Sequence, residues 1–166
     1  VDVFGQGVFV NPKPDAGSLG DAFPGLRDVA QRIGLDPDLA RYRPVSRYSV
    51  DQRSNWKLWY DNGTECYHCP TVHGPSFAAA FDPSEGDYEF VTFGSFSSSH
   101  FEPTRSAGPG LVGGTFRSVQ LFPGTQFIQQ DDLMVMGRII PTGPQTCRFV
   151  ADYLAEDDAH ALAVAR

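Results

Sequence analysis

His68 and His73 stand five residues apart, a spacing at which two imidazoles can bind one metal ion. Two neutral imidazoles and one carboxylate form the facial ligand set of non-heme Fe(II), which leaves coordination positions open for oxygen chemistry. Asp61 and Glu65 supply carboxylates shortly before this histidine pair. The residue types and their spacing therefore indicate a mononuclear iron site.

A helix is the element expected to position the first half of this site. Residues 56–68 contain no proline, and most of them are compatible with a helix. Asp61, Glu65 and His68 fall at i, i+4 and i+7, so one helix face would carry two carboxylates and an imidazole. Gly63 inside this helix lowers its stability, so we expect a local distortion or a close backbone approach there.

Pro70 is expected to end that helix, because a proline disfavours helical geometry at the residue before it, here Cys69. His73 would then lie on the following loop, free to turn back toward His68. A helix end and a loop would together build half of a metal site.

The segment 55–73 closely resembles the catalytic domain of Rieske non-heme iron oxygenase large subunits. The resemblance implies that His68 and His73 are iron ligands and that Glu65 and Asn62 are catalytic residues. Glu65 occupies the place of the family's bridging acid, which hydrogen-bonds toward a cluster-ligating histidine of a neighbouring subunit. Asn62 occupies the place of an asparagine that lies near the metal in the family. The matching motifs are Asn55-Trp56-Lys57, Asp61-Asn62, Glu65-Cys66-Tyr67-His68 and His73.

The same resemblance extends over nearly the whole chain and implies its domain organisation. Residues 1–14 would be a strand and linker leaving a Rieske domain, and residues 15–166 a catalytic domain truncated at its C-terminus. The third iron ligand of the family is an Asp in a C-terminal helix, so we expect this carboxylate just past Arg166. Glu156, Asp157 and Asp158 are the late acids that could replace it, although they fit better as N-terminal acids of a final helix. Further matching segments are 4–12, 121–126 and 139–144.

The activity implied by the resemblance is O2 activation at mononuclear Fe(2+), with electrons from a reductase or ferredoxin passing through a 2Fe-2S Rieske cluster. The cluster needs paired Cys and His motifs, and the printed residues do not contain them. The substrate would be an aromatic ring or a small organic molecule such as a quaternary amine. The family also implies a homotrimer, a possible small beta subunit and an inactive isolated fragment. The aromatic residues that could line the pocket are Tyr88, Phe90, Phe93, Phe96, Phe101 and Phe127, whereas Trp56, Trp59 and Tyr60 fit core or subunit contacts better.

Two other interpretations stay open. Cys66, His68, Cys69 and His73 could form a zinc site, since Cys-x-x-Cys with nearby histidines is a zinc-like pattern. A non-catalytic START-like ligand-binding domain would share the sheet and the pocket without a metal. The chain's three cysteines are expected to be reduced thiols rather than a disulfide framework.

Composition sets outer limits on fold and partners. A chain of 166 residues with 41% hydrophobic content is long enough for one domain with a real core. The net charge of −7, without a run of Lys and Arg, argues against nucleic acid as a partner. The apolar runs are too short to cross a membrane, and no signal peptide is visible, so a cytoplasmic location is expected.

The order of predicted elements indicates an α+β fold. Sequential strands followed by a helix favour an antiparallel sheet with helices packed on one face. The family resemblance makes this the helix-grip sheet of START/Bet v1-like domains. Residues 97–99 and 106–114 are expected to be loops, and Asp131-Asp132 a hairpin turn. We expect a helix at 26–33 and strands at 1–10, 43–50, 88–97, 115–122, 125–130, 133–140 and 146–154.

Overall fold

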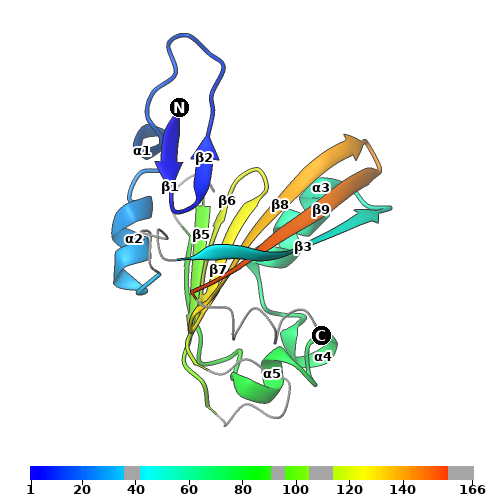
Figure 1. Ribbon diagram of the computed structural model, residues 1–166. Coiled ribbons are helices and arrows are strands. Elements are labelled where there is room, and N and C mark those ends of the chain that lie inside the picture. Colours follow the sequence, from blue (N-terminus) through cyan, green and yellow to red (C-terminus); the bar gives the residue numbers. More distant parts are fainter. Residues whose placement is uncertain (36–41, 91–95, 105–113, 157–166) are drawn as a thin grey trace.

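A seven-stranded antiparallel sheet forms the centre of the protein in a computed structural model that describes residues 1–35, 42–90, 96–104 and 114–156 (Figure 1). The strand order is β3-β9-β8-β7-β6-β5-β4, so the last strands of the chain lie between β3 and the middle of the sheet. The bounds are β3 Arg43–Gln52, β4 Asp87–Phe90, β5 Phe96–Phe101, β6 Phe116–Leu121, β7 Thr125–Gln130, β8 Leu133–Gly143 and β9 Thr146–Ala155.

Most of these strands lie where the sequence predicted them. The predicted strand at 125–130 coincides with β7, and β6, β8 and β9 begin within one residue of the prediction. The turn at Asp131-Asp132 is also confirmed: Asp131 has a φ of 51° between β7 and β8. The loop prediction for residues 97–99 was wrong, because these residues belong to β5 and pair with β6. The predicted final helix from residue 157 on, residues 106–113 of the predicted loop at 106–114, and residues 91–95 lie outside the described residues.

The first ten residues form a hairpin instead of the single strand that was predicted. β1 (Asp2–Phe4) pairs antiparallel with β2 (Gly7–Phe9). The chain reverses at Gly5, whose φ of 59° lies in the region that glycine adopts without strain. Two short helices follow, α1 (Leu19–Ala22) and α2 (Leu26–Arg32), and Gly34 ends the second with a φ of 71°.

One face of the sheet carries the main hydrophobic core. Apolar side chains of α2 and of the hairpin pack there against residues that alternate along the central strands. Each such side chain stabilises the fold by roughly 1.5–3 kcal/mol when it leaves water. The buried members of this core are Phe4, Leu26, Val29, Ala30, Leu35, Tyr42, Phe96, Val119, Leu121, Phe127, Met134 and Leu154.

Helix α3 (Trp56–Thr64) packs on the opposite face of the sheet. Asn55 begins the helix: its side chain accepts a hydrogen bond from the Lys57 backbone N–H and donates one to the Pro144 carbonyl at 2.7 Å. The Trp59 ring stacks on Phe149 of β9 with the ring centroids 4.2 Å apart. These contacts hold α3 flat on the sheet.

The end of α3 approaches the sheet most closely at Gly63. A Cβ added there would lie 2.4 Å from the side-chain oxygen of Gln120 on β6. The Gln120 side-chain amide in turn donates to the Tyr60 carbonyl at 3.0 Å. The prediction of a close backbone approach at Gly63 is therefore confirmed.

The architecture is α+β with a large antiparallel sheet, as predicted. After α3 the chain adds two short helices, α4 (Cys69–Val72) and α5 (Phe77–Ala80), before it enters β4. The prediction that the helices pack on one face of the sheet was wrong, because α2 and the hairpin cover the face opposite to α3. No helix within the described ranges combines the length and the apolar character needed to span a membrane.

Candidate functional site

The motif segment folds as two helices separated by residues 65–68. α3 ends at Thr64, and Glu65 has extended backbone angles of φ −128° and ψ 159°. The prediction of one helix through His68 was therefore wrong, and Asp61, Glu65 and His68 do not share one helix face. The helix ends because the backbone turns at Glu65, where the carboxylate hydrogen-bonds back to the motif.

Pro70 starts a helix rather than ending one. It lies in the first turn of α4, where its missing N–H leaves no helical hydrogen bond unmade. His68 is the residue before α4 and His73 the residue after it. The two histidines therefore stand at opposite ends of one short helix, with their ring centroids 5.0 Å apart.

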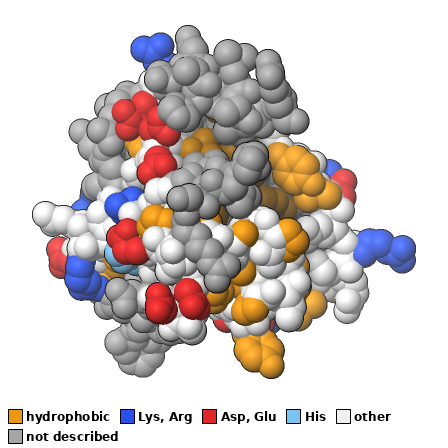
Figure 2. All heavy atoms as spheres, turned by 90° about the horizontal axis from the view of Figure 1, so that it is seen from below, with side chains coloured by type: hydrophobic (Ala, Val, Ile, Leu, Met, Phe, Trp, Pro, Cys, Tyr) orange, Lys and Arg blue, Asp and Glu red, His pale blue; other side chains and the backbone are white. Residues whose placement is uncertain are grey.

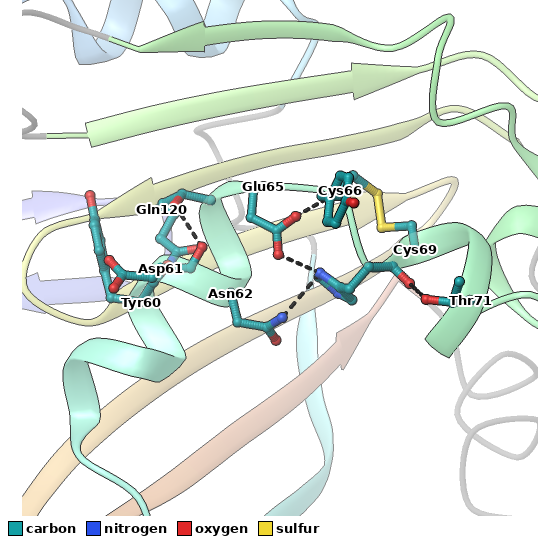
Figure 3. Close-up of polar contacts among 11 residues, drawn as sticks. Tyr60, Asp61, Asn62, Glu65, Cys66, Cys69, Thr71 and Gln120 are labelled. Carbon is teal, nitrogen blue, oxygen red and sulfur yellow. Dashed lines mark hydrogen bonds and ion pairs between the residues drawn. A yellow bond between two sulfur atoms is a disulfide. The ribbon is translucent and has the colours of Figure 1, made fainter.

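Glu65 and Asn62 both contact the same ring nitrogen of His68 (Figure 3). The distance between His68 Nδ1 and Glu65 Oε1 is 2.6 Å, and Asn62 Nδ2 lies 3.0 Å from the same Nδ1. A carboxylate can only accept, so the short contact makes Nδ1 the donor and leaves the lone pair on Nε2. A histidine that binds a metal commonly donates its other ring N–H to a carboxylate in this way.

Glu65 is held in its ionised form. Partial desolvation raises the pKa of this carboxyl, but hydrogen bonds from His68 and from the Tyr67 backbone N–H together outweigh that effect. The net result is a pKa below the ordinary value for Glu. At neutral pH the carboxylate is therefore available to orient the imidazole.

Cys66 and Cys69 are joined by a disulfide that spans the two residues between them, Tyr67 and His68, with Cα atoms 4.9 Å apart. The expectation of reduced thiols was wrong for this pair, because the turn into α4 brings the two Cβ atoms together. Cys147 is a free, buried thiol. The paired sulfurs are not available as thiolate ligands, so the structure does not support the zinc interpretation.

A cavity of about 290 Å³ lies between the motif and the sheet. Both histidines, Asn62 and Glu65 line it, so the structure brings all four predicted site residues together. On the sheet side the cavity is lined by polar residues that the sequence reasoning missed. These are Ser97, Ser98, Ser99, Ser118 and Gln126. The sequence contains one indication of these residues: three consecutive serines, 97–99, stand between Phe96 and Phe101. If this segment is recognised as a strand, its serines are expected to face a polar site.

The predicted aromatic lining is partly confirmed. Phe101 lines the cavity, together with Phe77 of α5 and Phe116 of β6, whereas Phe96 and Phe127 lie in the main core on the other sheet face. Phe77 packs edge-on against both of its partners, with centroid distances of 5.0 Å to Phe101 and 5.1 Å to Phe116. Trp59 was expected in the core or at a subunit contact and also borders the cavity. The side chains of Tyr88, Phe90 and Phe93 lie outside the described part of the chain.

The predicted third iron ligand lies outside the described residues. Within them, no three His, Cys, Asp or Glu side chains converge in an arrangement that could hold a metal ion. Glu156 is described and exposed, and Asp157 and Asp158 are not described. The described part of the site thus supplies a histidine pair and an orienting carboxylate.

The face on which α4 and α5 lie exposes hydrophobic and acidic side chains beside one another (Figure 2). Two exposed hydrophobic residues come from the motif segment itself: Tyr67 is 94% exposed and Val72 is 65% exposed.

Comparison with known proteins gives a family match over most of the chain. The family described as "Ring hydroxylating alpha subunit (catalytic domain)" matches residues 39–165. The carnitine monooxygenase oxygenase subunit of Escherichia coli (strain K12) is 37% identical over 71 residues, which are 43% of this chain and 18% of that protein. The corresponding subunit of Acinetobacter baumannii is 33% identical over 79 residues, 47% of this chain and 20% of that protein.

Solved structures share the fold. The quaternary ammonium Rieske monooxygenase CntA in complex with L-carnitine superposes with a TM-score of 0.68 at 22% identity, covering 89% of this chain and 38% of that one. Naphthalene 1,2-dioxygenase from Rhodococcus sp. bound to indole gives a TM-score of 0.64 at 19% identity, covering 88% of this chain and 42% of that one. Both neighbours have the helix-grip fold that the resemblance predicted. The chain spans less than half the length of the proteins that it matches.

Proposed function

The chain belongs to the family of ring-hydroxylating alpha-subunit catalytic domains, and from this premise we propose that it forms the iron-binding part of a Rieske-type oxygenase. Such an enzyme uses O2 to oxidise a small organic molecule. The observation that carries the proposal is the short contact between Glu65 and Nδ1 of His68, beside His73 and at the edge of a cavity. This arrangement prepares one imidazole to bind a metal through its remaining nitrogen.

The residues present fit ferrous iron. Two neutral imidazoles suit this ion, and a carboxylate in the outer shell fixes the tautomer of one of them. His68 and His73 would hold the iron together with a carboxylate that the family resemblance puts after Arg166. Bound iron supplies redox and oxygen chemistry that side chains do not perform. Glu65 contributes by keeping the proton of His68 on Nδ1, and Asn62 lies beside the same ring nitrogen.

Glu65 also fits the role of a bridging acid toward a Rieske cluster in a neighbouring subunit. Its side chain is 42% exposed while it holds His68, so one face of the carboxylate remains open to a partner. The exposed Tyr67 and Val72 lie in the same segment. The structure of a quaternary ammonium Rieske monooxygenase, similar to this chain in fold, is described as giving insights into inter-subunit electron transfer, which supports this role here. The whole enzyme would then be a homotrimer served by a reductase or ferredoxin, with a small beta subunit as a further possible partner.

Two substrate classes fit the proposal: quaternary amines and aromatic rings. The relatives named carnitine monooxygenase oxygenase subunit favour the first class. The phenylalanines at one end of the cavity can face a cation or pack on a ring. A START-like domain that only binds ligands would share the cavity, but it does not require an imidazole pair held by a carboxylate.

The test is a count of mononuclear ferrous iron in the whole protein under anaerobic conditions. The EPR signal of the nitric oxide adduct reports this iron separately from an iron–sulfur cluster. We expect near-stoichiometric iron in the wild type and its loss in His68→Ala and His73→Ala. His100→Ala is the matched control, because His100 lies on β5 and pairs with Glu102 at 3.1 Å. Equal iron in all four proteins, or none in the wild type, would refute the iron site.

A further inference from the structure

We propose that the sheet side of the cavity binds a hydrogen-bonding group of the substrate, so that the site takes a small polar molecule rather than an unsubstituted hydrocarbon. This inference rests on the proposed function, because it concerns the substrate of the same cavity. It is carried by the polar side chains of β5, β6 and β7 that lie beneath α3.

These polar side chains share one face of the sheet because of the strand register. Ser97 pairs with Gln120, and Gln120 pairs with Gln126, so the three form one row across the strands. Ser99 pairs with Ser118 in the next row on the same face. Ser97 and Ser118 are each 6% exposed, and Gln120 is 2% exposed. Burying these three polar side chains beneath a helix is unfavourable unless each finds a hydrogen-bond partner.

The opposite face of the same strands is mainly apolar. There the alternating residues are Phe96, Val119, Leu121 and Phe127, all of them 1% exposed or less and part of the main core. That face also holds two buried polar residues, Ser98 and Gln129, and the Gln129 amide donates to the Tyr42 hydroxyl at 3.0 Å. The face beneath α3 is nevertheless the more polar of the two. A departure from the pattern at a cavity is expected where a ligand supplies the missing partners.

The Ser99–Ser118 pair offers both donor and acceptor capacity to a ligand. Their hydroxyl oxygens lie 2.8 Å apart, so one hydroxyl donates to the other. Each hydroxyl has one donor and two acceptor positions, so the pair keeps one O–H and three acceptor positions after that bond. Gln126 also lines the cavity and adds an amide with both functions. The pair can therefore bind a hydroxyl, carbonyl or amide group.

The charges around the cavity point to the same class of ligand. The titratable residues among the described cavity lining are Glu65, His68 and His73, and the lining residues in this part of the chain include no Lys or Arg. On the sheet side of the cavity a carboxylate or phosphate would thus meet hydrogen-bond donors without a Lys or Arg beside it. A neutral hydrogen-bonding group is the better match to these residues.

An apolar corner adjoins the hydroxyl pair. Phe101 follows Ser99 by two residues on β5, and Phe116 precedes Ser118 by two residues on β6, so both rings lie on the same face next to the hydroxyls. Phe77 closes this corner from α5. A cavity of about 290 Å³ is at the small end for ligand sites, and it fits a molecule built around a single ring or a short branched chain.

Benzyl alcohol and toluene form a probe pair that tests the inference, because they share a ring and differ by one hydroxyl. Their dissociation constants would be measured with the whole protein by ligand-observed NMR. We expect about tenfold tighter binding of benzyl alcohol, the ratio that corresponds to one additional satisfied hydrogen bond. The preference should fall to about one in Ser99→Ala and Ser118→Ala and persist in Ser99→Thr, which keeps a hydroxyl. Ser84→Ala is the control, since Ser84 is exposed and bonds only to Asp82 in the described residues.

Each outcome decides the inference independently of the iron site. Equal affinities in the wild type, no binding of benzyl alcohol, or an unchanged preference in both alanine variants would overturn it. The same titration in His73→Ala separates the two proposals. If this variant loses iron and keeps the preference, both proposals stand. If the wild type binds no iron and keeps the preference, only the proposed function fails.

Discussion

Replacing Gly63 by alanine should destabilise this protein, although alanine is normally the better residue inside a helix. The added Cβ would lie 2.4 Å from Oε1, 2.9 Å from Nε2 and 3.0 Å from Cδ of Gln120. Gln120 is 2% exposed, and its amide is already engaged with the Tyr60 carbonyl. The glutamine therefore has little room to move aside without giving up that hydrogen bond.

The magnitude follows from three contributions. Inserting a methyl group into a packed site costs ~2 kcal/mol, and loss of the Gln120 to Tyr60 hydrogen bond costs ~1 kcal/mol. The higher helix propensity of alanine stabilises the helix by ~1 kcal/mol. The free energy of unfolding should therefore fall by a net ~2 kcal/mol. In a Gln120→Ala background the clash is absent, and Gly63→Ala should stabilise by ~1 kcal/mol.

Urea unfolding followed by tryptophan fluorescence measures this cycle, because both tryptophans lie in α3. The expected coupling energy between Gly63→Ala and Gln120→Ala is ~3 kcal/mol, the difference between a loss of 2 and a gain of 1. Gly20→Ala in α1 is the control, since the nearest atom to its added Cβ is at 3.6 Å. If Gly63→Ala raised the stability of the wild type and of the Gln120→Ala protein equally, the close approach of α3 to the sheet would be disproved.

Three further predictions address the site and its supports. The carboxyl of Glu65 should titrate below the ordinary glutamate pKa in NMR of the metal-free protein, and this pKa should rise in His68→Ala because a hydrogen bond to the ionised form is lost. The stabilisation from this ionised carboxylate is present above the unfolded-state pKa and is lost as the pH falls through the lower folded-state pKa. Asn55→Ala should lower the free energy of unfolding by about 1 kcal/mol through loss of the helix cap on the Lys57 N–H, and unchanged urea stability would contradict the capping role. Met134→Ala should lower it by about 2–5 kcal/mol, since this side chain is fully buried in the main core, and a loss below 1 kcal/mol would show that the core is loosely packed there.

The strands could be predicted from the sequence because they are rich in β-branched and aromatic residues and are separated by turn residues. The predicted bounds of β7 are the observed ones, and Phe127 of this strand points to the core. The serines of β5 have no such signal. A run of three serines resembles a loop by propensity, but β4 and β6 pair with the segment on both sides and override that preference.

The histidine pair could be predicted from residue types and spacing, whereas the backbone that carries it could not. Proline is compatible with the first turn of a helix and also with the residue after one, so Pro70 alone does not decide between the two. The choice is made by contacts that the sequence pattern does not display. The Glu65 carboxylate accepts hydrogen bonds from Tyr67 and His68, and these bonds favour a break before the histidine rather than after it.

This break explains how residues five apart can serve one site. On a continuous helix, five residues correspond to a rise of about 7.5 Å and to a rotation that turns the two side chains to different sides. His68 and His73 instead flank α4, with backbone angles of φ −80°, ψ −17° and φ −106°, ψ 23°, and their ring centroids lie 5.0 Å apart. The short helix therefore acts as the spacer that brings the imidazoles together. Glu65 and Asn62 then reach His68 from the end of α3, so the geometry of the site depends on how closely α3 approaches the sheet at Gly63.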